Sequence, residues 1–308
     1  MQPQIKLSKS LLRRNYDSIR GLKKPSWLKV KISNSNTTQF TKDVITQNNL
    51  KTVCEEAACP NIHECWSKNH ATFMILGDTC TRSCSFCNVQ TGMPNEVDIF
   101  EPLKVANAVK QLGLKHVVIT SVDRDDLSDG GAGQFYKVIS SIKKKSPLTT
   151  IEILTPDFYK KNNAIEILKD ASFDIFNHNM ETVRRLYWDV RPGANFERSL
   201  NLLKSVKQHK KDVFTKSGIM IGLGETFEEI LMVMDSLLEN NVDFLTVGQY
   251  MRPTKFHHPV HKYHNPSYFK KLENIAYKKG FKLVSASPFT RSSFHADEDF
   301  KKLKNLVA

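Results

Sequence analysis

The chain has 308 residues and a mass of 35.2 kDa, enough for one large domain or two ordinary ones. Hydrophobic residues make up 40% and charged residues 25%, and the mean hydropathy is -0.39. This composition is that of a globular protein and excludes a disordered or fibrous chain. No apolar run approaches the roughly 18 residues that a membrane-spanning helix needs, so we expect neither a transmembrane protein nor a membrane partner.

The net charge is +13 and gathers at the N-terminus, where residues 1–53 hold eleven Lys or Arg against two acids. Such a basic arm suits an acidic partner, although most basic runs are simply solvated surface. The arm lacks the apolar core and cleavage site of a secretory signal. A mitochondrial presequence is less favoured, because the stretch is rich in Lys and weakly amphipathic. We therefore expect a cytoplasmic, bacterial protein.

Along the chain, β-rich runs alternate with helical patterns. The sequence predicts strands over 72–76, 116–120, 150–154, 173–176, 213–221 and 243–247. It predicts helices over 103–112, 135–144, 162–169, 196–208 and 227–238. The last helix has Ile230, Met234 and Leu237 at helical spacing and a start at Thr226. A strand followed by a helix, repeated in this way, indicates an α/β fold with a parallel sheet.

We expect this sheet to form a partial (βα)6 barrel of the TIM type rather than an open doubly wound sheet. Reactive residues of barrels lie on loops at the C-terminal ends of strands, and residues 77–87, which are rich in cysteine, follow the first predicted strand. The expected parts are an N-terminal extension over 1–71, the barrel over 72–280 and a C-terminal segment over 281–308.

All six cysteines fall in one window and form two triplets, Cys54-x4-Cys59-x5-Cys65 and Cys80-x3-Cys84-x2-Cys87. A secreted disulfide framework would spread its cysteines. Thiolates at these spacings can converge on zinc, copper(I) or an iron–sulfur cluster. A six-cysteine zinc module, or two incomplete zinc sites completed by His63 and His70, is disfavoured because zinc motifs prefer paired C-x2-4-C knuckles. Three cysteines on one loop would instead leave one iron of a [4Fe–4S] cube free to bind a ligand.

The second triplet, with Phe86 before its last cysteine, resembles the signature of radical S-adenosylmethionine (SAM) enzymes. The resemblance implies a [4Fe–4S] cluster on Cys80, Cys84 and Cys87, whose open iron binds SAM and whose electron cleaves it to a 5′-deoxyadenosyl radical. The first triplet resembles the auxiliary-cluster motif of the lipoyl synthase family. Residues 291–296, Arg-Ser-Ser-Phe-His-Ala, resemble that family's Arg-Ser-Ser-aromatic-x-Ala segment. The match runs from residue 24 to about residue 297.

The resemblance implies a second [4Fe–4S] cluster, held by Cys54, Cys59, Cys65 and Ser293. Taken alone, a Ser-Ser pair near a C-terminus is usually a turn or a helix cap. The implied activity is that of a sulfurtransferase, which inserts two sulfur atoms at carbons 6 and 8 of an octanoyl chain on a lysine of a lipoyl carrier domain. The auxiliary cluster would donate its own sulfides, and two SAM molecules would be used.

The implied partners are octanoylated carrier domains, found on acyltransferase subunits of 2-oxoacid dehydrogenases and on the glycine cleavage H protein. A flavodoxin or ferredoxin would supply electrons, and a further protein would rebuild the auxiliary cluster. The basic arm could steer the docking of an acidic carrier domain. The alternative is an RNA-modifying radical enzyme, but the chain has no spare length for an RNA-binding module, so we expect no nucleic acid.

Three residues after the fourth predicted strand are candidate SAM contacts. A polar cluster there is often only a turn and a cap. By resemblance to biotin synthase, Asn179 and Glu181 would contact the ribose or methionine part of SAM. Arg191, in an Arg-Pro-Gly segment similar to that of lipoyl synthases, would pair the carboxylate.

Other polar or glycine-rich segments have weaker interpretations. Residues 218–225 lack the spacing of a dinucleotide fingerprint, and we expect their backbone to lie near the adenine of SAM. Asp123, Arg124 and Asp126 should lie near the cofactor or the incoming peptide. Four of the ten histidines fall within 257–264; we interpret them as surface enrichment rather than a zinc site, and only His257 matches the family's Pro-Thr-x-x-His run.

Overall fold

The fold is known from a computed structural model that describes residues 22–30, 35–68, 70–159, 161 and 163–306. Its main sheet has eight strands in the order β1-β2-β5-β6-β7-β8-β9-β10. The seven from β2 onward run parallel: β2 (Thr72–Ile75), β5 (His116–Ser121), β6 (Thr150–Leu154), β7 (Ile175–Asn177), β8 (Phe214–Ile221), β9 (Phe244–Gln249) and β10 (Leu283–Ser287). All six predicted strands are thus confirmed.

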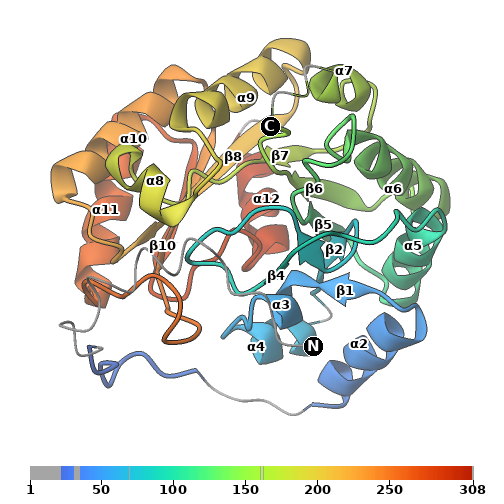
Figure 1. Cartoon of the computed structure of the whole chain (residues 1–308), viewed down its shortest axis with the longest axis horizontal. Helices are drawn as coiled ribbons and strands as arrows, with labels where there is room; N and C mark the ends of the chain where they lie inside the picture. The colour runs from blue at the N-terminus through green and yellow to red at the C-terminus, as the bar shows by residue number, and fades with distance from the viewer. Residues whose placement is uncertain (1–21, 31–34, 69, 160, 162, 307–308) are drawn as a thin grey trace.

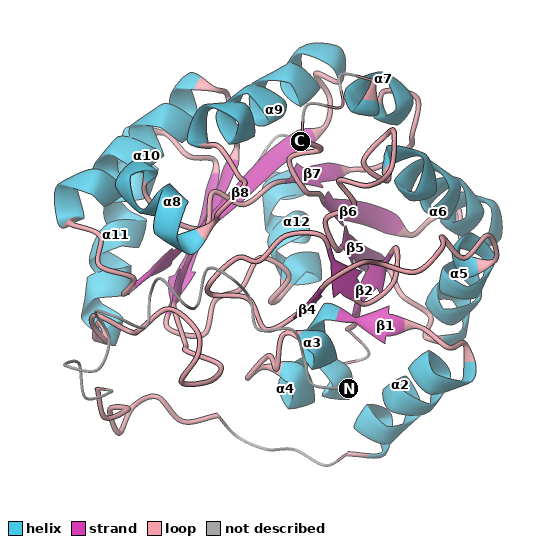
Figure 2. Cartoon of the chain, in the orientation of Figure 1, coloured by secondary structure: helices cyan, strands magenta, loops and turns pink. Residues whose placement is uncertain are grey.

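The curved sheet lies inside an arc of helices (Figures 1 and 2). These are α5 (Glu101–Gln111), α6 (Ala132–Lys145), α7 (Ala164–Leu168), α9 (Phe196–His209), α10 (Phe227–Glu239) and α11 (Pro266–Lys279). The predicted start of α10 is confirmed by a capping box, in which Thr226 and Glu229 bond each other's backbone N–H groups. An α/β fold with a mostly parallel sheet, as expected for a partial barrel, is therefore present.

The N-terminal extension adds short elements below the barrel in Figure 1. They are α2 (Asn36–Gln47), α3 (Val53–Glu56), α4 (Ile62–Ser67) and β1 (Lys51–Thr52), which pairs antiparallel with β2. Helix α2 begins at Ser35, whose hydroxyl accepts a hydrogen bond from the Thr38 N–H. The extension thus continues the sheet at the β2 edge.

The C-terminal part contains two elements that the periodicity did not predict. Residues 283–287, expected to belong to the C-terminal segment, form β10 beside β9. Helix α12 (Ala296–Asn305) carries Phe300, whose ring stacks on His116 at 5.3 Å and meets Phe214 edge-on at 6.4 Å. Because His116 and Phe214 are the first residues of β5 and β8, α12 covers the amino ends of the strands. The carboxyl ends are left for a site.

Among the residues that the structure describes, no helix is both long enough and apolar enough to cross a membrane.

Candidate functional site

A cavity of about 470 Å³ lies at the carboxyl ends of the parallel strands. This volume falls in the range of about 300–1,000 Å³ that is usual for cofactor and ligand sites. Its walls come from the barrel strands, the loop after β2, the N-terminal extension and residues 290–293. They include five of the six cysteines and four other residues singled out by the sequence: Cys54, Cys59, Cys80, Cys84, Cys87, Asn179, Glu181, Arg191 and Ser293.

The loop 77–87, which carries the second cysteine triplet, is fixed to the barrel by backbone hydrogen bonds. The Thr81 N–H donates to the Asp123 carbonyl at 3.1 Å, and the Ser85 N–H donates to the Val190 carbonyl at 2.9 Å. His257 secures the end of the loop, because its Nδ1 accepts from the Thr254 N–H and its Nε2 lies 3.1 Å from the Cys87 carbonyl. The loop is therefore held in place from three sides.

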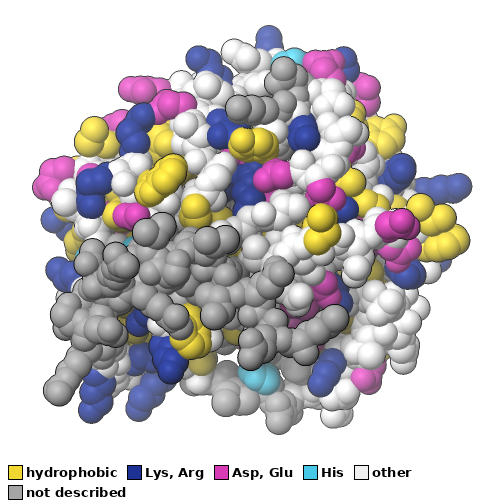
Figure 3. All heavy atoms as spheres, viewed as in Figure 1, with side chains coloured by type: hydrophobic (Ala, Val, Ile, Leu, Met, Phe, Trp, Pro, Cys, Tyr) yellow, Lys and Arg dark blue, Asp and Glu magenta, His cyan; other side chains and the backbone are white. Residues whose placement is uncertain are grey.

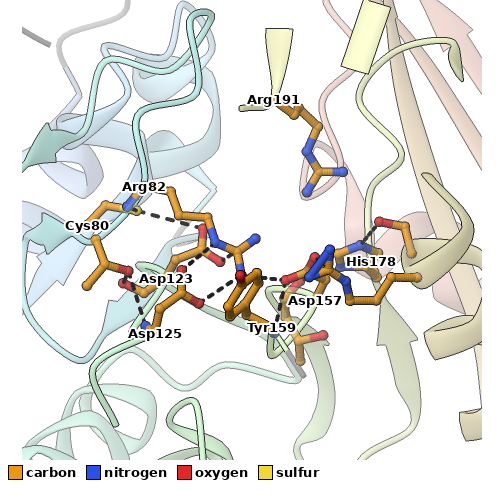
Figure 4. A network of polar contacts seen from close by, with 12 residues as sticks. Cys80, Arg82, Asp123, Asp125, Asp157, Tyr159, His178 and Arg191 are labelled. Carbon is orange, nitrogen blue, oxygen red and sulfur yellow. Dashed lines mark hydrogen bonds and ion pairs between the residues drawn. The ribbon is translucent and has the colours of Figure 1, made fainter. Parts of the chain in front are cut away.

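A buried ion-pair network anchors the same loop from within (Figure 4). We call it the Arg82 network: Arg82, Asp123, Asp125 and Asp157. Arg82 bonds both oxygens of Asp125 at 2.8 Å, reaches Asp157 at 2.6 Å and lies 3.4 Å from Asp123. Only 5% of the Arg82 side chain is exposed and none of Asp157. Burial alone would lower the pKa of Arg82, but these carboxylates raise it, so the guanidinium stays charged and joins the loop to the ends of β5 and β6.

Sequence analysis missed Arg82 and Asp157. The signal was present, because Arg82 stands inside the cysteine motif and Asp157 follows a predicted strand. Residues after neighbouring parallel strands meet at one edge of a sheet, which is where this network lies.

The thiols of Cys80, Cys84 and Cys87 converge on the cavity, and none is in a disulfide. Burial raises the pKa of Cys84 to about 12, and burial together with the Asp123 charge raises the pKa of Cys80. Burial thus disfavours the thiolate forms of Cys80 and Cys84, whereas metal ligands are thiolates, so a bound cation would offset this cost. The donor set therefore fits a cationic, sulfur-loving group such as an iron–sulfur cluster.

The first cysteine triplet forms a second group of mutually facing thiols. The Cys59 N–H donates to the Cys54 carbonyl at 2.9 Å, and Cys65 lies on α4. Burial and then the neighbouring Cys59 raise the pKa of Cys54 to about 12; burial and then Cys54 and Cys59 raise the pKa of Cys65. In the described part of the chain, no three His, Cys, Asp or Glu side chains meet closely enough for a single metal ion. A cluster makes no such demand, because each thiolate of a cube binds a different iron.

The C-terminal segment brings Ser293 to the same cavity wall as Cys54 and Cys59. Three contacts bind this segment to the N-terminal extension. Asn61 Nδ2 donates to the Phe289 carbonyl at 2.7 Å, His295 lies 3.1 Å from Glu64, and Lys68 lies 3.3 Å from Glu298. Residues more than 200 positions apart in sequence thus form one corner of the cavity.

The candidate SAM contacts also line the cavity and bond to one another. Asn179 donates to Glu181 at 3.0 Å, and Glu181 has a left-handed backbone (φ 64°) that its hydrogen bonds to β8 support. Burial raises the pKa of Glu181, and Arg191 opposes that shift. Arg191 Nη1 is occupied by the Asn179 carbonyl and the Tyr187 hydroxyl, but its buried Nε has no hydrogen-bond partner in the described structure. That donor could serve a bound ligand.

Two expectations about charged and polar clusters need correction. Asp123 lines the cavity, but Arg124 and Asp126 do not, because they pair with each other at 2.8 Å. The histidine cluster is not surface enrichment: His257, His258 and His264 are buried and bond to backbone or to neighbouring side chains. Only His261 is exposed.

A parallel α/β barrel with a three-cysteine loop at the carboxyl ends of its strands defines a class of cluster-dependent enzymes. Residues 74–237, more than half of the chain, match the radical SAM superfamily, and the chain belongs to that superfamily. It is therefore an enzyme, and membership implies a [4Fe–4S] cluster and SAM as cofactors.

Solved structures support the fold. Streptococcus suis SuiB bound to S-adenosylmethionine is 16% identical with a TM-score of 0.54, over 73% of this chain and 53% of SuiB. Methylornithine synthase (PylB) is 15% identical with a TM-score of 0.52, over 87% of this chain and 91% of PylB. HydG, a maturase of the [FeFe]-hydrogenase, is 11% identical with a TM-score of 0.52, and the match covers 86% of this chain and 71% of HydG. The chain spans little more than half of SuiB, and at these identities the likeness concerns the fold alone.

Proposed function

We propose that the chain is a lipoyl synthase, which inserts sulfur at carbons 6 and 8 of an octanoyl chain attached to a lysine of a lipoyl carrier domain. One observation carries the proposal: Cys54, Cys59 and Ser293 line a single cavity with the radical SAM cysteines, and Cys65, which is also free, completes their triplet. A radical SAM enzyme without a sulfur-donating or second-cluster role has no use for another cysteine triplet beside this cavity.

The lining of the cavity suits an apolar substrate. Beside its charged groups it presents hydrocarbon and thioether side chains from both the N-terminal extension and the barrel, among them Val53, Ala57, Met74, Val122 and Met220. An octanoyl chain enclosed there would be removed from water at a gain of roughly 0.8 kcal/mol per buried CH₂ group. The charged groups can hold SAM while the apolar groups hold the acyl chain.

Two sets of residues would hold the two clusters. Cys80, Cys84 and Cys87 would hold the first cluster, and the Arg82 network fixes their loop against the barrel. When bound, this cluster and SAM supply one-electron chemistry that can remove hydrogen from an unactivated C–H bond. Cys54, Cys59, Cys65 and Ser293 would hold a second cluster as the source of sulfur. An oxygen ligand is harder than thiolate, so Ser293 would be the ligand of this cluster that matches iron–sulfur chemistry least.

The proposed partners follow from the substrate. Lys23, Lys24 and Lys29 are exposed, and Lys24 also borders the cavity, so basic groups stand where a carrier domain must deliver its octanoyl-lysine. Figure 3 shows Lys and Arg side chains at the lower left of the face on which Figure 1 places the segment 22–30. Residues 1–21 and Lys31 of the basic arm lie outside the described residues. We further propose a flavodoxin or ferredoxin as electron donor, a cluster-repair protein, and a bacterial cytoplasm as compartment.

Anaerobic iron and sulfide analysis tests the cluster count, since two cubes give about eight of each per chain. Wild type should reach that number and Cys54→Ala about half of it. Mass spectrometry of an octanoylated peptide should show dithiolated product with wild type. Cys54→Ala should still release 5′-deoxyadenosine but form no carbon–sulfur bond. Dithiolated product at wild-type yield from Cys54→Ala would show that the sulfur source lies elsewhere and that the enzyme has another reaction.

A further inference from the structure

The segment 290–292 is seated directly on the backbone of two barrel strands. A Cβ atom on Gly248 of β9 would lie 2.1 Å from the Thr290 carbonyl oxygen. A Cβ atom on Gly218 of β8 would lie 2.5 Å from Thr246 Oγ1, 2.8 Å from Asn179 Oδ1 and 3.2 Å from Ser292 Oγ. Real Cβ atoms do not come within 3.0 Å of another heavy atom, so the segment can dock only if position 248 is glycine, whereas the glycine at 218 mainly leaves room for Thr246 and Asn179. The expectation that the backbone of residues 218–225 lies near the adenine of SAM stays a prediction.

Ser292 makes a hydrogen bond that neither cluster site explains. Its hydroxyl donates to Asn179 Oδ1 at 2.9 Å, and Asn179 Nδ2 donates to Glu181 Oε1 at 3.0 Å. A carboxylate can only accept, so the amide nitrogen must face Glu181 and the amide oxygen must face Ser292. Glu181 therefore sets the orientation of the Asn179 amide, and the Ser292 hydroxyl, which donates to the amide oxygen, holds the amide in that place.

The neighbours of Ser292 also line the cavity. Arg291 on one side interacts electrostatically with Cys59 and Glu181, and its Nη1 donates to the Thr290 carbonyl at 2.6 Å. Ser293 on the other side lines the cavity near Cys54 and Cys59. Three consecutive residues thus connect a hydrogen bond to a candidate SAM contact with a side chain that lines the same cavity as Cys54 and Cys59.

We propose that Ser292 is a positioning residue for SAM: it holds Asn179 in place and thereby links the affinity for SAM to the docking of the segment that carries Ser293. The inference rests on the proposed placement of SAM against Asn179 and Glu181. The link is reciprocal, because a ligand that favours the docked segment is itself bound more tightly when the segment is docked. Release of Ser293 from its site would pull Ser292 from Asn179 and loosen SAM.

The first test measures SAM affinity by anaerobic equilibrium dialysis on the reconstituted full chain, with iron and sulfide content measured in parallel. Ser292→Ala should bind SAM about three- to tenfold more weakly, the factor expected for one net hydrogen bond, with unchanged iron and sulfide. Ser292→Thr, which keeps the hydroxyl, should restore most of the affinity. Ser285→Ala is the matched control, because its hydroxyl bonds Asp299 at 2.8 Å on α12, outside the lining of the cavity, and it should bind as wild type does.

The variant Asn179→Ala distinguishes a failure of the Ser292 inference from a failure of the proposed SAM site. If it weakens SAM binding but Ser292→Ala does not, Ser292 has no positioning role and the proposed site stands. If neither variant weakens binding, SAM is not held at Asn179, and the placement falls together with the inference.

The second test follows the segment itself by hydrogen–deuterium exchange of the reconstituted protein. Saturating SAM should slow exchange of the backbone amides of residues 289–295 in wild type and should slow it much less in Ser292→Ala. Equal slowing in the two proteins, or none in wild type, would refute the link between SAM and the segment.

Discussion

Replacing Arg82 by methionine tests whether the Arg82 network holds the cysteine loop on the barrel. The substitution keeps a long apolar stem but removes the charge that pairs with Asp123, Asp125 and Asp157. Breaking a buried ion pair by removing one partner costs about 3–5 kcal/mol, because the remaining charge stays buried. Asp157 keeps a weaker contact with Arg198 at 3.5 Å. We therefore expect the loss of stability to lie within about 3–5 kcal/mol and not above it.

Calorimetry of the reduced apoprotein gives the measurement. With an unfolding entropy of ~2.1 cal/mol/K per residue, the 308 residues give about 0.65 kcal/mol/K, so Tm should fall by about 5–8 °C. Arg82→Lys should lower Tm by a smaller amount than Arg82→Met. Lysine keeps the charge, but its ammonium group cannot reproduce the guanidinium fork that bonds two carboxylates. The thiols of Cys80 and Cys84 should also become easier to alkylate, because the loop that buries them is released.

Arg185→Met is the matched control. Arg185 also makes a two-pronged pair, to Glu229 at 2.7 and 2.9 Å, but 55% of its side chain is exposed. An exposed pair contributes at most about 1 kcal/mol, so Tm should fall by no more than about 2 °C. If Arg82→Met and Arg185→Met lowered Tm equally and left thiol alkylation unchanged, the network would not be what fixes the loop.

Three further outcomes are expected. Cys80→Ala should abolish 5′-deoxyadenosine formation under anaerobic reducing conditions, because the cluster loses one of three ligands; full formation would exclude the loop as its site. Neutralising Lys23, Lys24 and Lys29 should weaken binding of an octanoylated carrier domain more at low salt than at high salt, as titrations at two ionic strengths would show; unchanged affinity in both would leave the arm without a docking role. Burial, reinforced by Arg191, lowers the pKa of His178 to about 4, so the unfolded chain binds a proton before the folded one as pH falls from about 6.5 to 4. About 3 kcal/mol of stability should be lost over that window, and His178→Gln should flatten the dependence in denaturant titrations; a dependence equal to that of wild type would contradict this origin.

The strands of the barrel could be predicted because their residues are strongly β-forming and buried on both faces. β5, for example, begins His-Val-Val-Ile and is buried over its first five residues. β10 escaped prediction because its sequence, Leu-Val-Ser-Ala-Ser, is short and ends in small residues that any turn could contain. Its pairing with β9, rather than its own propensity, makes it a strand.

The cysteines of the site were predictable because three thiols at close spacing have few uses. The partners of those cysteines were not, because they depend on which distant loops the fold brings together. His257 shows the difference: its sequence neighbourhood suggested a polar surface, yet its ring is buried against the carbonyl of Cys87, 170 residues away. Ser292 is similar, since nothing local distinguishes it from any other serine of a turn.

The corner that joins Asn61 to Phe289 and Glu64 to His295 has a consequence for how the protein is made. These pairs are separated by 228 and 231 residues. At a translation rate of about 5–20 residues per second, the first cysteine triplet leaves the ribosome on the order of 10–50 s before its C-terminal partners exist. Arg82 meets Asp157 after only 75 residues, so the loop of Cys80 can settle on a nascent barrel much earlier. In the proposed enzyme, the thiols of Cys54, Cys59 and Cys65 are therefore the ones that stay longest without their C-terminal partners and without protection from oxidants.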